Sequence, residues 1–131
     1  MSTQLPDRFL QLPIYKKAIE IFNLAQNISE YLVCDLGELT PDGKEKYGVY
    51  FSGDIVQQST SLAPEILKAE MEVESSQRKM RAARVRRLTQ MLYRNSFRLE
   101  KCQSNGRDYL PILRKELKKF RKLQRTWMLT L

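Results

Sequence analysis

Apolar residues recur at alternating steps of four and three along the first long segment of this chain, and this spacing most restricts the possible fold. Side chains at such steps lie on one face of an α-helix, so the segment predicts a helix with one buried stripe. The stripe consists of Ile14, Ala18, Ile21, Ala25, Ile28 and Leu32. Three later segments show related spacing, and strand-like alternation is nearly missing. The sequence therefore predicts an all-α protein.

Four long helices are predicted within a single domain that spans residues 1–131. Their approximate ranges are 13–33, 47–70, 76–103 and 108–129. Short links between long helices favour antiparallel neighbours. With 42% hydrophobic residues, the chain can fill one core but not two. We therefore expect an antiparallel up-and-down four-helix bundle.

The three later helices each carry a predicted buried face. In the second helix it is Ser52, Ile55, Ser59, Leu62, Ile66 and Ala69. In the third it is Val85, Leu88, Met91, Leu92, Leu99 and Cys102. In the fourth it is Leu113, Leu117, Phe120, either Leu123 or Gln124, and Trp127. These faces would meet the stripe of the first helix in a common core.

Local signals refine the helix boundaries. Pro64 lies inside the second pattern, where its missing N–H and its ring should bend or break the helix just before it. Ser75 or Ser76 is a possible cap for the third helix, and Asp108 is a possible cap for the fourth. We therefore expect capped starts for both basic helices.

Several classes of function are disfavoured by what the sequence lacks. Histidine is absent, so the usual general base and the commonest zinc ligand are missing. Cys34 and Cys102 are too few for a disulfide framework or a metal cluster, and Asp54 and Glu65 are lone carboxylates. We expect no catalytic residue, metal, cofactor or small-molecule substrate, and therefore no enzyme.

Membrane insertion and export are also disfavoured. No apolar run approaches the roughly 20 residues that a bilayer span requires. The first residues lack the basic-then-apolar order of a secretory signal. The sequence therefore predicts a cytoplasmic protein with no membrane contact.

Charge is divided unequally along the chain. Residues 1–77 carry a formal charge of −6 and residues 78–131 carry +14, which leaves +8 in total. Such asymmetry indicates an anionic partner, an oppositely charged protein face, or pairing within the protein itself.

The strongest functional signal is the segment from Arg78 to Lys101, which holds nine basic residues and one acid, Glu100. Its candidate nucleic-acid-binding residues are Arg78, Lys79, Arg86, Arg87, Arg94, Arg98 and Lys101. Four of these fall in one narrow sector opposite the apolar face and would form a ridge about two dozen ångströms long. The members of this ridge are Arg87, Arg94, Arg98 and Lys101.

Three interpretations of the ridge stay open. It is a solvated face that keeps the protein soluble, a contact for RNA or DNA backbone, or a surface that meets the acidic half of a neighbouring subunit. Arg81 and Arg84 should project into the apolar sector, either reaching Glu70, Glu72 or Glu74 or forming a subunit interface or the lining of a central opening.

The fourth helix is also basic, and its charges are expected to surround the exposed side, with Glu116 pairing with Lys119. These cations are Arg114, Lys115, Lys118, Lys119, Arg121, Lys122 and Arg125. Tyr93 and Phe97 flank the ridge, but aromatics are too poorly interleaved with the charges to indicate sequence-specific RNA recognition.

Two segments resemble bacterial four-helix bundle proteins related to the 23S rRNA intervening-sequence proteins, especially their Bacteroidetes-type branch. One is Leu12-Pro-Ile-Tyr-Lys-Lys-Ala-Ile-Glu-Ile-Phe22, and the other runs from Tyr109 to Leu123 and is followed by Trp127. Ser61-Leu-Ala-Pro-Glu-Ile66 lies where the family carries an apolar-Pro-x-x-Ile motif.

The resemblance implies an up-and-down bundle that often assembles into a homopentamer with a central opening and has no established catalytic activity. Related accessory proteins of diversity-generating retroelements form basic pentameric barrels that engage a reverse transcriptase and nucleic acid. We therefore expect a homo-oligomer that binds nucleic acid backbone through the third and fourth helices. The alternative is a protein-interaction scaffold or accessory subunit whose charge asymmetry drives assembly.

Overall fold

The chain is all-α in a computed structural model that describes residues 7–36, 47–101 and 108–131. The described residues form five helices and no strand. The helices are α1 (Asp7–Leu10), α2 (Pro13–Leu36), α3 (Tyr47–Met71), α4 (Ser75–Glu100) and α5 (Leu110–Met128).

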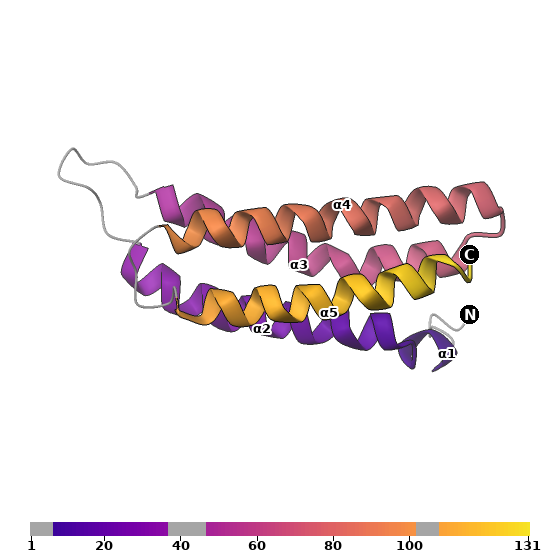
Figure 1. Cartoon of the computed structure of the whole chain (residues 1–131), viewed down its shortest axis with the longest axis horizontal. Helices are drawn as coiled ribbons and strands as arrows, with labels where there is room; N and C mark the ends of the chain where they lie inside the picture. Colours follow the sequence, from indigo (N-terminus) through magenta and orange to yellow (C-terminus); the bar gives the residue numbers. More distant parts are fainter. Residues whose placement is uncertain (1–6, 37–46, 102–107) are drawn as a thin grey trace, which may run out of the picture.

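The four long helices lie side by side, and each runs opposite to the one before it (Figure 1). The extensive contacts join α2 to α3, α3 to α4, α4 to α5, and α5 back to α2. This closed cycle places the α2–α3 seam and the α4–α5 seam on opposite sides of the molecule. The short α1 packs against α2.

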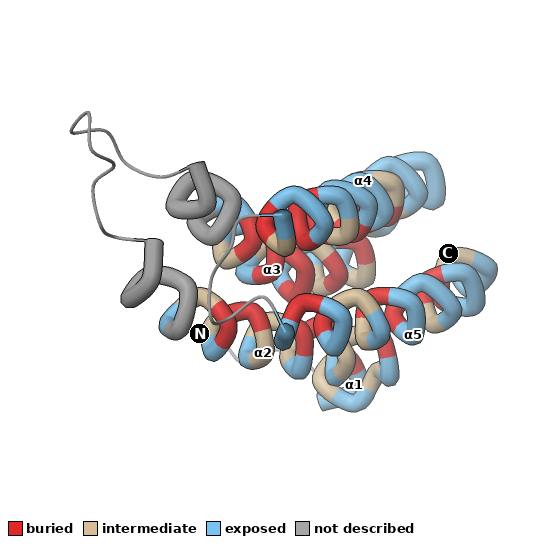
Figure 2. Tube along the Cα trace, turned by 60° about the vertical axis from the view of Figure 1, so that its left-hand side comes forward, coloured by how far each residue is buried: buried red, intermediate tan, exposed pale blue. Residues whose placement is uncertain are grey.

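The core fills the space between the four long helices, with buried residues on the sides that face one another (Figure 2). In α2, the five stripe members with described side chains are all buried: Ile14, Ala18, Ile21, Ala25 and Ile28. The predicted face of α3 is buried likewise, at Ile55, Ser59, Leu62, Ile66 and Ala69. Each large aliphatic side chain buried in this way contributes roughly 1.5–3 kcal/mol. Leu32, Cys34, Ser52 and Cys102 lie outside the residues whose side chains are described.

Helix α5 contributes the largest buried side chains, Phe120 and Trp127. Leu113 and Leu117 complete its predicted stripe. At the position where the sequence left a choice, Gln124 is buried while Leu123 is only partly buried. An amide therefore occupies a core position of α5.

The α3–α4 seam is the most extensive contact between helices. Small residues are buried on both helices, at Ser59 on α3 and at Ala82 and Ser96 on α4, and small residues allow helices to approach closely. Nδ2 of Asn95 donates a hydrogen bond of 3.1 Å to Oε1 of Gln58, which joins the two helices through buried amides. The prediction that Met91 is buried is wrong, because its side chain is 46% exposed.

Helix α3 continues through Pro64, so of the two predicted outcomes a break is excluded, while the bend stays a prediction. Pro64 and Thr60, whose carbonyl loses its helical donor, are both exposed, and water can satisfy that carbonyl. On the opposite side, Leu62 and Ile66 are fully buried. Packing of the buried side therefore holds the helix across the proline.

The ends of the basic helices differ from the predicted caps. Helix α4 begins at Ser75 after Glu74, and no side chain caps it, because the Ser75 hydroxyl donates instead to the carbonyl of Leu131 at 3.4 Å. The residue that precedes α5 is Tyr109 rather than Asp108, again without a side-chain cap. The link between α3 and α4 is only residues 72–74, which explains why no glycine marks it.

Candidate nucleic-acid interface

The exposed face of α4 carries the predicted ridge. Arg87, Arg94, Arg98 and Lys101 are all exposed. From Arg87 to Lys101, the residue that follows α4, is fourteen helical steps and therefore about 21 Å along the axis. Nη1 of Arg98 also lies 3.4 Å from Oδ1 of Asn95, and this contact anchors its side chain to the seam. The position of the ridge thus agrees with the sequence analysis, while its role stays a prediction.

The first turns of α4 hold cations that the chain neutralises itself. Arg78 pairs with Glu70 at 3.4 Å, and Glu70 also accepts a hydrogen bond of 2.6 Å from the indole nitrogen of Trp127. Arg81 pairs with Glu72 at 2.7 Å. Arg78, a candidate nucleic-acid contact, is therefore part of a partly buried internal network.

Two other candidates near this end are more accessible. Lys79 and Arg84 are exposed. The expectation that Arg84 projects into the apolar sector is wrong, because its side chain lies on the solvent side of α4. Arg81 was expected to reach an acid, and it pairs with Glu72 in the short link before α4.

Arg114 is the exception among the cations of α5. It was expected on the exposed side, but it is partly buried against α4 and its side chain is only 11% exposed. Its guanidinium lies 2.6 Å from a carboxylate oxygen of Glu100, 3.4 Å from the hydroxyl of Ser96, and 4.1 Å from the ring centroid of Phe97. The exposed cations of α5 are Lys115, Lys118, Lys119, Arg121, Lys122 and Arg125.

The contact with Arg114 also restricts the aromatic residues beside the ridge. Tyr93 and Phe97 pack edge to face, with ring centroids 5.2 Å apart. Because the guanidinium of Arg114 covers one face of the Phe97 ring, that face is closed to base stacking. Only the other face of the Phe97 ring is then left for a stacked base.

Further along the same seam, α4 and α5 enclose a basic pocket of about 200 Å³. Its cations are Arg86, Arg121 and Arg125, and no described carboxylate forms an ion pair with any of them. The remaining lining residues are Thr89, Gln90, Gln124 and Met128. We call this the arginine pocket.

Gln124 lies at the inner wall of the arginine pocket. The residue is only 4% exposed, and its Nε2 atom is shielded and has no acceptor among the described residues. The Thr89 hydroxyl donates to the carbonyl of Val85 at 2.8 Å. Sequence analysis placed Arg86 among the candidates but did not join it to Arg121 and Arg125, because the register between α4 and α5 is set by tertiary packing. A polar residue within the apolar stripe of α5 was the available signal.

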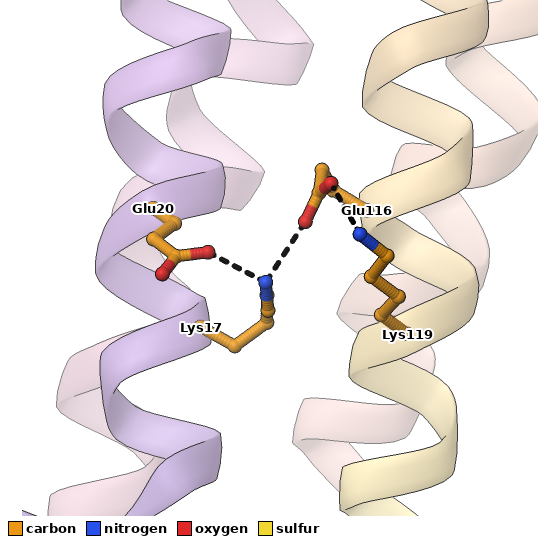
Figure 3. A network of polar contacts seen from close by, with 4 residues as sticks. All are labelled: Lys17, Glu20, Glu116 and Lys119. Atoms are coloured by element: carbon orange, nitrogen blue, oxygen red, sulfur yellow. Dashed lines mark hydrogen bonds and ion pairs between the residues drawn. The ribbon is translucent and has the colours of Figure 1, made fainter.

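On its α2 side, α5 carries an ion-pair network (Figure 3). Nζ of Lys17 lies 2.6 Å from Glu20 and 2.9 Å from Glu116, and Glu116 also pairs with Lys119 at 3.2 Å, as predicted. Hydrogen bonds to Glu20 and Glu116 raise the pKa of Lys17 above its ordinary value. The hydrogen bond from Lys17 lowers the pKa of Glu116. This side of α5 is therefore neutralised, in contrast to the arginine pocket.

The described residues offer neither a metal centre nor a membrane-spanning helix. Within the described ranges, no group of three or more His, Cys, Asp and Glu side chains is arranged to hold a metal ion. No helix in the described part of the chain is both long and apolar enough to span a membrane.

No protein-family model, curated protein or solved structure matches the chain. The resemblance to the 23S rRNA intervening-sequence proteins therefore stays a prediction.

Proposed function

We propose that the chain is a non-enzymatic, antiparallel up-and-down four-helix bundle that binds the phosphate backbone of RNA or DNA through α4 and α5. The observation that carries this proposal is the number of exposed cations on these two helices. The ridge on α4 and the exposed cations of α5 outnumber nearby acids, and the arginine pocket joins the two helices. Backbone phosphates are the natural counter-charge for such a surface.

The kind of recognition follows from the same contacts. The cations are spread over two helices, and a ring that could stack on bases, Phe97, is covered on one face by Arg114. Phosphate contacts fix position but carry little sequence information. The proposed binding is therefore strong at low salt, weak at high salt, and tolerant of sequence.

A salt-dependent titration tests the proposal. Single- and double-stranded RNA and DNA are titrated with nucleic-acid-free protein at about 50 and 200 mM salt. Each phosphate contact contributes about 0.9 to the slope of log K against log salt for duplex DNA, so Arg87→Ala with Arg94→Ala should flatten the slope by about two units. The matched control is Lys16→Ala with Lys68→Ala, which removes the same charge from exposed positions of α2 and α3.

The comparison of the two double variants shows whether binding depends on the α4 ridge or only on the net charge of the protein. Equal slopes for both double variants would mean that net charge, rather than the α4 ridge, governs binding. Absence of binding at the lower salt would overturn the proposed function.

A second candidate function is homo-oligomeric assembly, favoured by the α2–α3 seam. This seam holds a mostly apolar pocket of about 230 Å³ on the side of the molecule opposite the basic seam. Its principal apolar residues are Tyr15, Ile19, Phe22, Ala63 and Leu67. The acidic half of one copy would meet the basic half of the next in a head-to-tail contact, which closes into a ring when the rotation permits.

Mass measurement by light scattering tests assembly. We expect an oligomer at about 50 mM salt and a smaller mass at about 500 mM salt, because screening weakens attraction between exposed charges. Ile19→Lys adds a cation to the seam that would meet a basic face and should give a monomer at both salts. A wild-type mass of 15.5 kDa under both conditions would exclude assembly.

A further inference from the structure

The arginine pocket gathers three positive charges without a described counter-charge. Arg86, Arg121 and Arg125 are exposed, whereas the partly buried arginines described on α4 and α5 each pair with an acid: Arg78 with Glu70, Arg81 with Glu72 and Arg114 with Glu100. In the arginine pocket, guanidinium groups from two helices line one concavity instead. Mutual repulsion opposes such an arrangement, so the pocket has the charge of an anion site.

Gln124 supplies a second, independent indication. Its neighbours in the α5 stripe are apolar, and a leucine would suit the same position, yet the structure buries an amide there. A buried donor without an acceptor is unfavourable. Gln124 also lines the pocket, so an oxygen of an anion bound there is a candidate acceptor for this amide.

The number and type of donors indicate which anion. Arginine presents a planar fork of N–H donors that matches phosphate oxygens. The three arginines of the pocket together carry three positive charges. A phosphodiester within a strand offers two non-bridging oxygens and one negative charge, whereas a terminal phosphate offers three such oxygens and nearly two charges. A volume of about 200 Å³ is far more than one water requires.

We propose that the arginine pocket binds a terminal phosphate group, a phosphomonoester, between Arg86, Arg121 and Arg125 with the Gln124 amide completing its coordination. The inference rests on the proposed function for the source of that group, since the end of a nucleic-acid strand carries one. Internal phosphates would then lie on the α4 ridge, while the pocket fixes one end of the strand. Inorganic phosphate shares the same chemistry and is the second possible source.

Matched oligonucleotides test this inference. Three oligonucleotides of one sequence are compared: one with a 5′-phosphate, one with a 3′-phosphate, and one with hydroxyls at both ends. Charge-assisted hydrogen bonds contribute enough that one phosphorylated end should increase affinity about tenfold over the hydroxyl ends. Gln124→Leu should remove this preference and leave the affinity of the hydroxyl oligonucleotide within about twofold. Arg121→Ala removes a cation of the proposed backbone-binding surface, so it should remove the preference and also weaken binding of the hydroxyl oligonucleotide. The control Arg87→Ala should weaken all three ligands and keep the preference.

The charge of the ligand gives a further readout. The second ionisation of a phosphomonoester lies near pH 6, so the preference should decrease between about pH 7 and pH 5 as the group loses one charge. The chain has no histidine, the side chain whose charge ordinarily changes in that range. A preference that does not change with pH would overturn recognition of the dianion.

Failure of the inference is distinguishable from failure of the proposed function. Equal, salt-sensitive affinity for all three oligonucleotides would overturn the terminal-phosphate inference and leave backbone binding intact. If none of the oligonucleotides binds, the proposed function fails. Thermal unfolding in inorganic phosphate then tests whether the pocket binds phosphate at all. The Tm in phosphate is compared with the Tm in chloride at equal ionic strength. A higher Tm in phosphate that is lost in Gln124→Leu would support a site for free phosphate. An equal Tm in both salts would overturn the proposed phosphate site.

Discussion

Arginine side chains lie in two different environments along the α4–α5 seam. Arg114 is held by Glu100, by the hydroxyl of Ser96 and by the ring of Phe97. About two helical turns further along α5, Arg121 and Arg125 face Arg86 without a described acid. The difference between the two places is the neighbour on α4. Arg114 meets an acid there, whereas Arg121 and Arg125 meet another arginine.

The largest expected effect comes from the same substitution at both places. Arg114→Met should lower the free energy of unfolding by about 2 kcal/mol, because it leaves Glu100 without a partner and removes the contact with Phe97. Arg121→Met should change stability by no more than about 0.5 kcal/mol, since no ion pair is lost. Urea denaturation of both variants measures the difference. Equal losses would show that the two places are not distinct.

Gln124→Leu should stabilise the protein by about 1 kcal/mol, because an apolar side chain of similar size replaces a buried donor without an acceptor. The same denaturation experiment measures this gain. Gln58→Leu is the control, since its amide is also buried but accepts the hydrogen bond from Asn95, and its loss should destabilise the protein. A lower stability for Gln124→Leu would mean that the amide is satisfied in the protein without a ligand.

Gln90→Glu should make the arginine pocket resemble the Arg114 end. The new carboxylate would lie in the lining beside three arginines and should raise stability by roughly 0.5 kcal/mol while opposing anion binding. Thermal unfolding at low and high salt measures the gain, which should decrease as salt screens the charges. Gln57→Glu, at an exposed position of α3, is the control with the same change of charge. A gain of equal size in both would remove any special role for the pocket.

The smallest expected effect concerns the neutralised side of α5. The pKa of Glu116 is lowered in the folded protein, so its contribution to stability is present above about pH 4.5 and is lost as the pH falls through the lower folded value. The pKa of Lys17 is raised, so its contribution is present below about pH 10.5 and is lost as the pH rises through the higher folded value. Glu116→Gln should therefore cost up to about 1 kcal/mol at pH 7 and less at pH 3.

Denaturation of wild-type and Glu116→Gln proteins at the two pH values measures that effect. Glu74→Gln, at an exposed carboxylate, is the control and should give a smaller difference at pH 7. A cost that stays constant from pH 3 to pH 7 would show that the Lys17–Glu116 pair does not contribute through its charge.

Periodic features were predictable from sequence, whereas contacts across seams were not. The stripe of α2 was predicted because many residues repeat the same spacing, and the signal survives a few exceptions. The pairing of Arg81 with the short acidic link was also within reach, since the two are only nine positions apart. Lys17 and Glu116 lie 99 positions apart, and their meeting depends on how α2 and α5 are placed along each other.

The same reasoning explains the outcomes at Pro64 and Arg114. Local chemistry predicted a bend or a break at Pro64, and burial of Leu62 and Ile66 on the opposite side keeps the helix continuous. Arg114 was wrongly counted with the exposed cations, because its partner Glu100 lies on another helix. At both positions tertiary packing decides what the local signal leaves open.

The contact between Trp127 and Glu70 has a spectroscopic consequence. Trp127 is the single tryptophan of the chain, and its indole is 5% exposed and hydrogen-bonded to a carboxylate next to the α3–α4 link. Its fluorescence therefore reports on the end of the molecule where α3 meets α4. Loosening of the opposite end, where α4 ends and α5 begins, would leave that emission unchanged, so a fluorescence melt follows only one end of this protein.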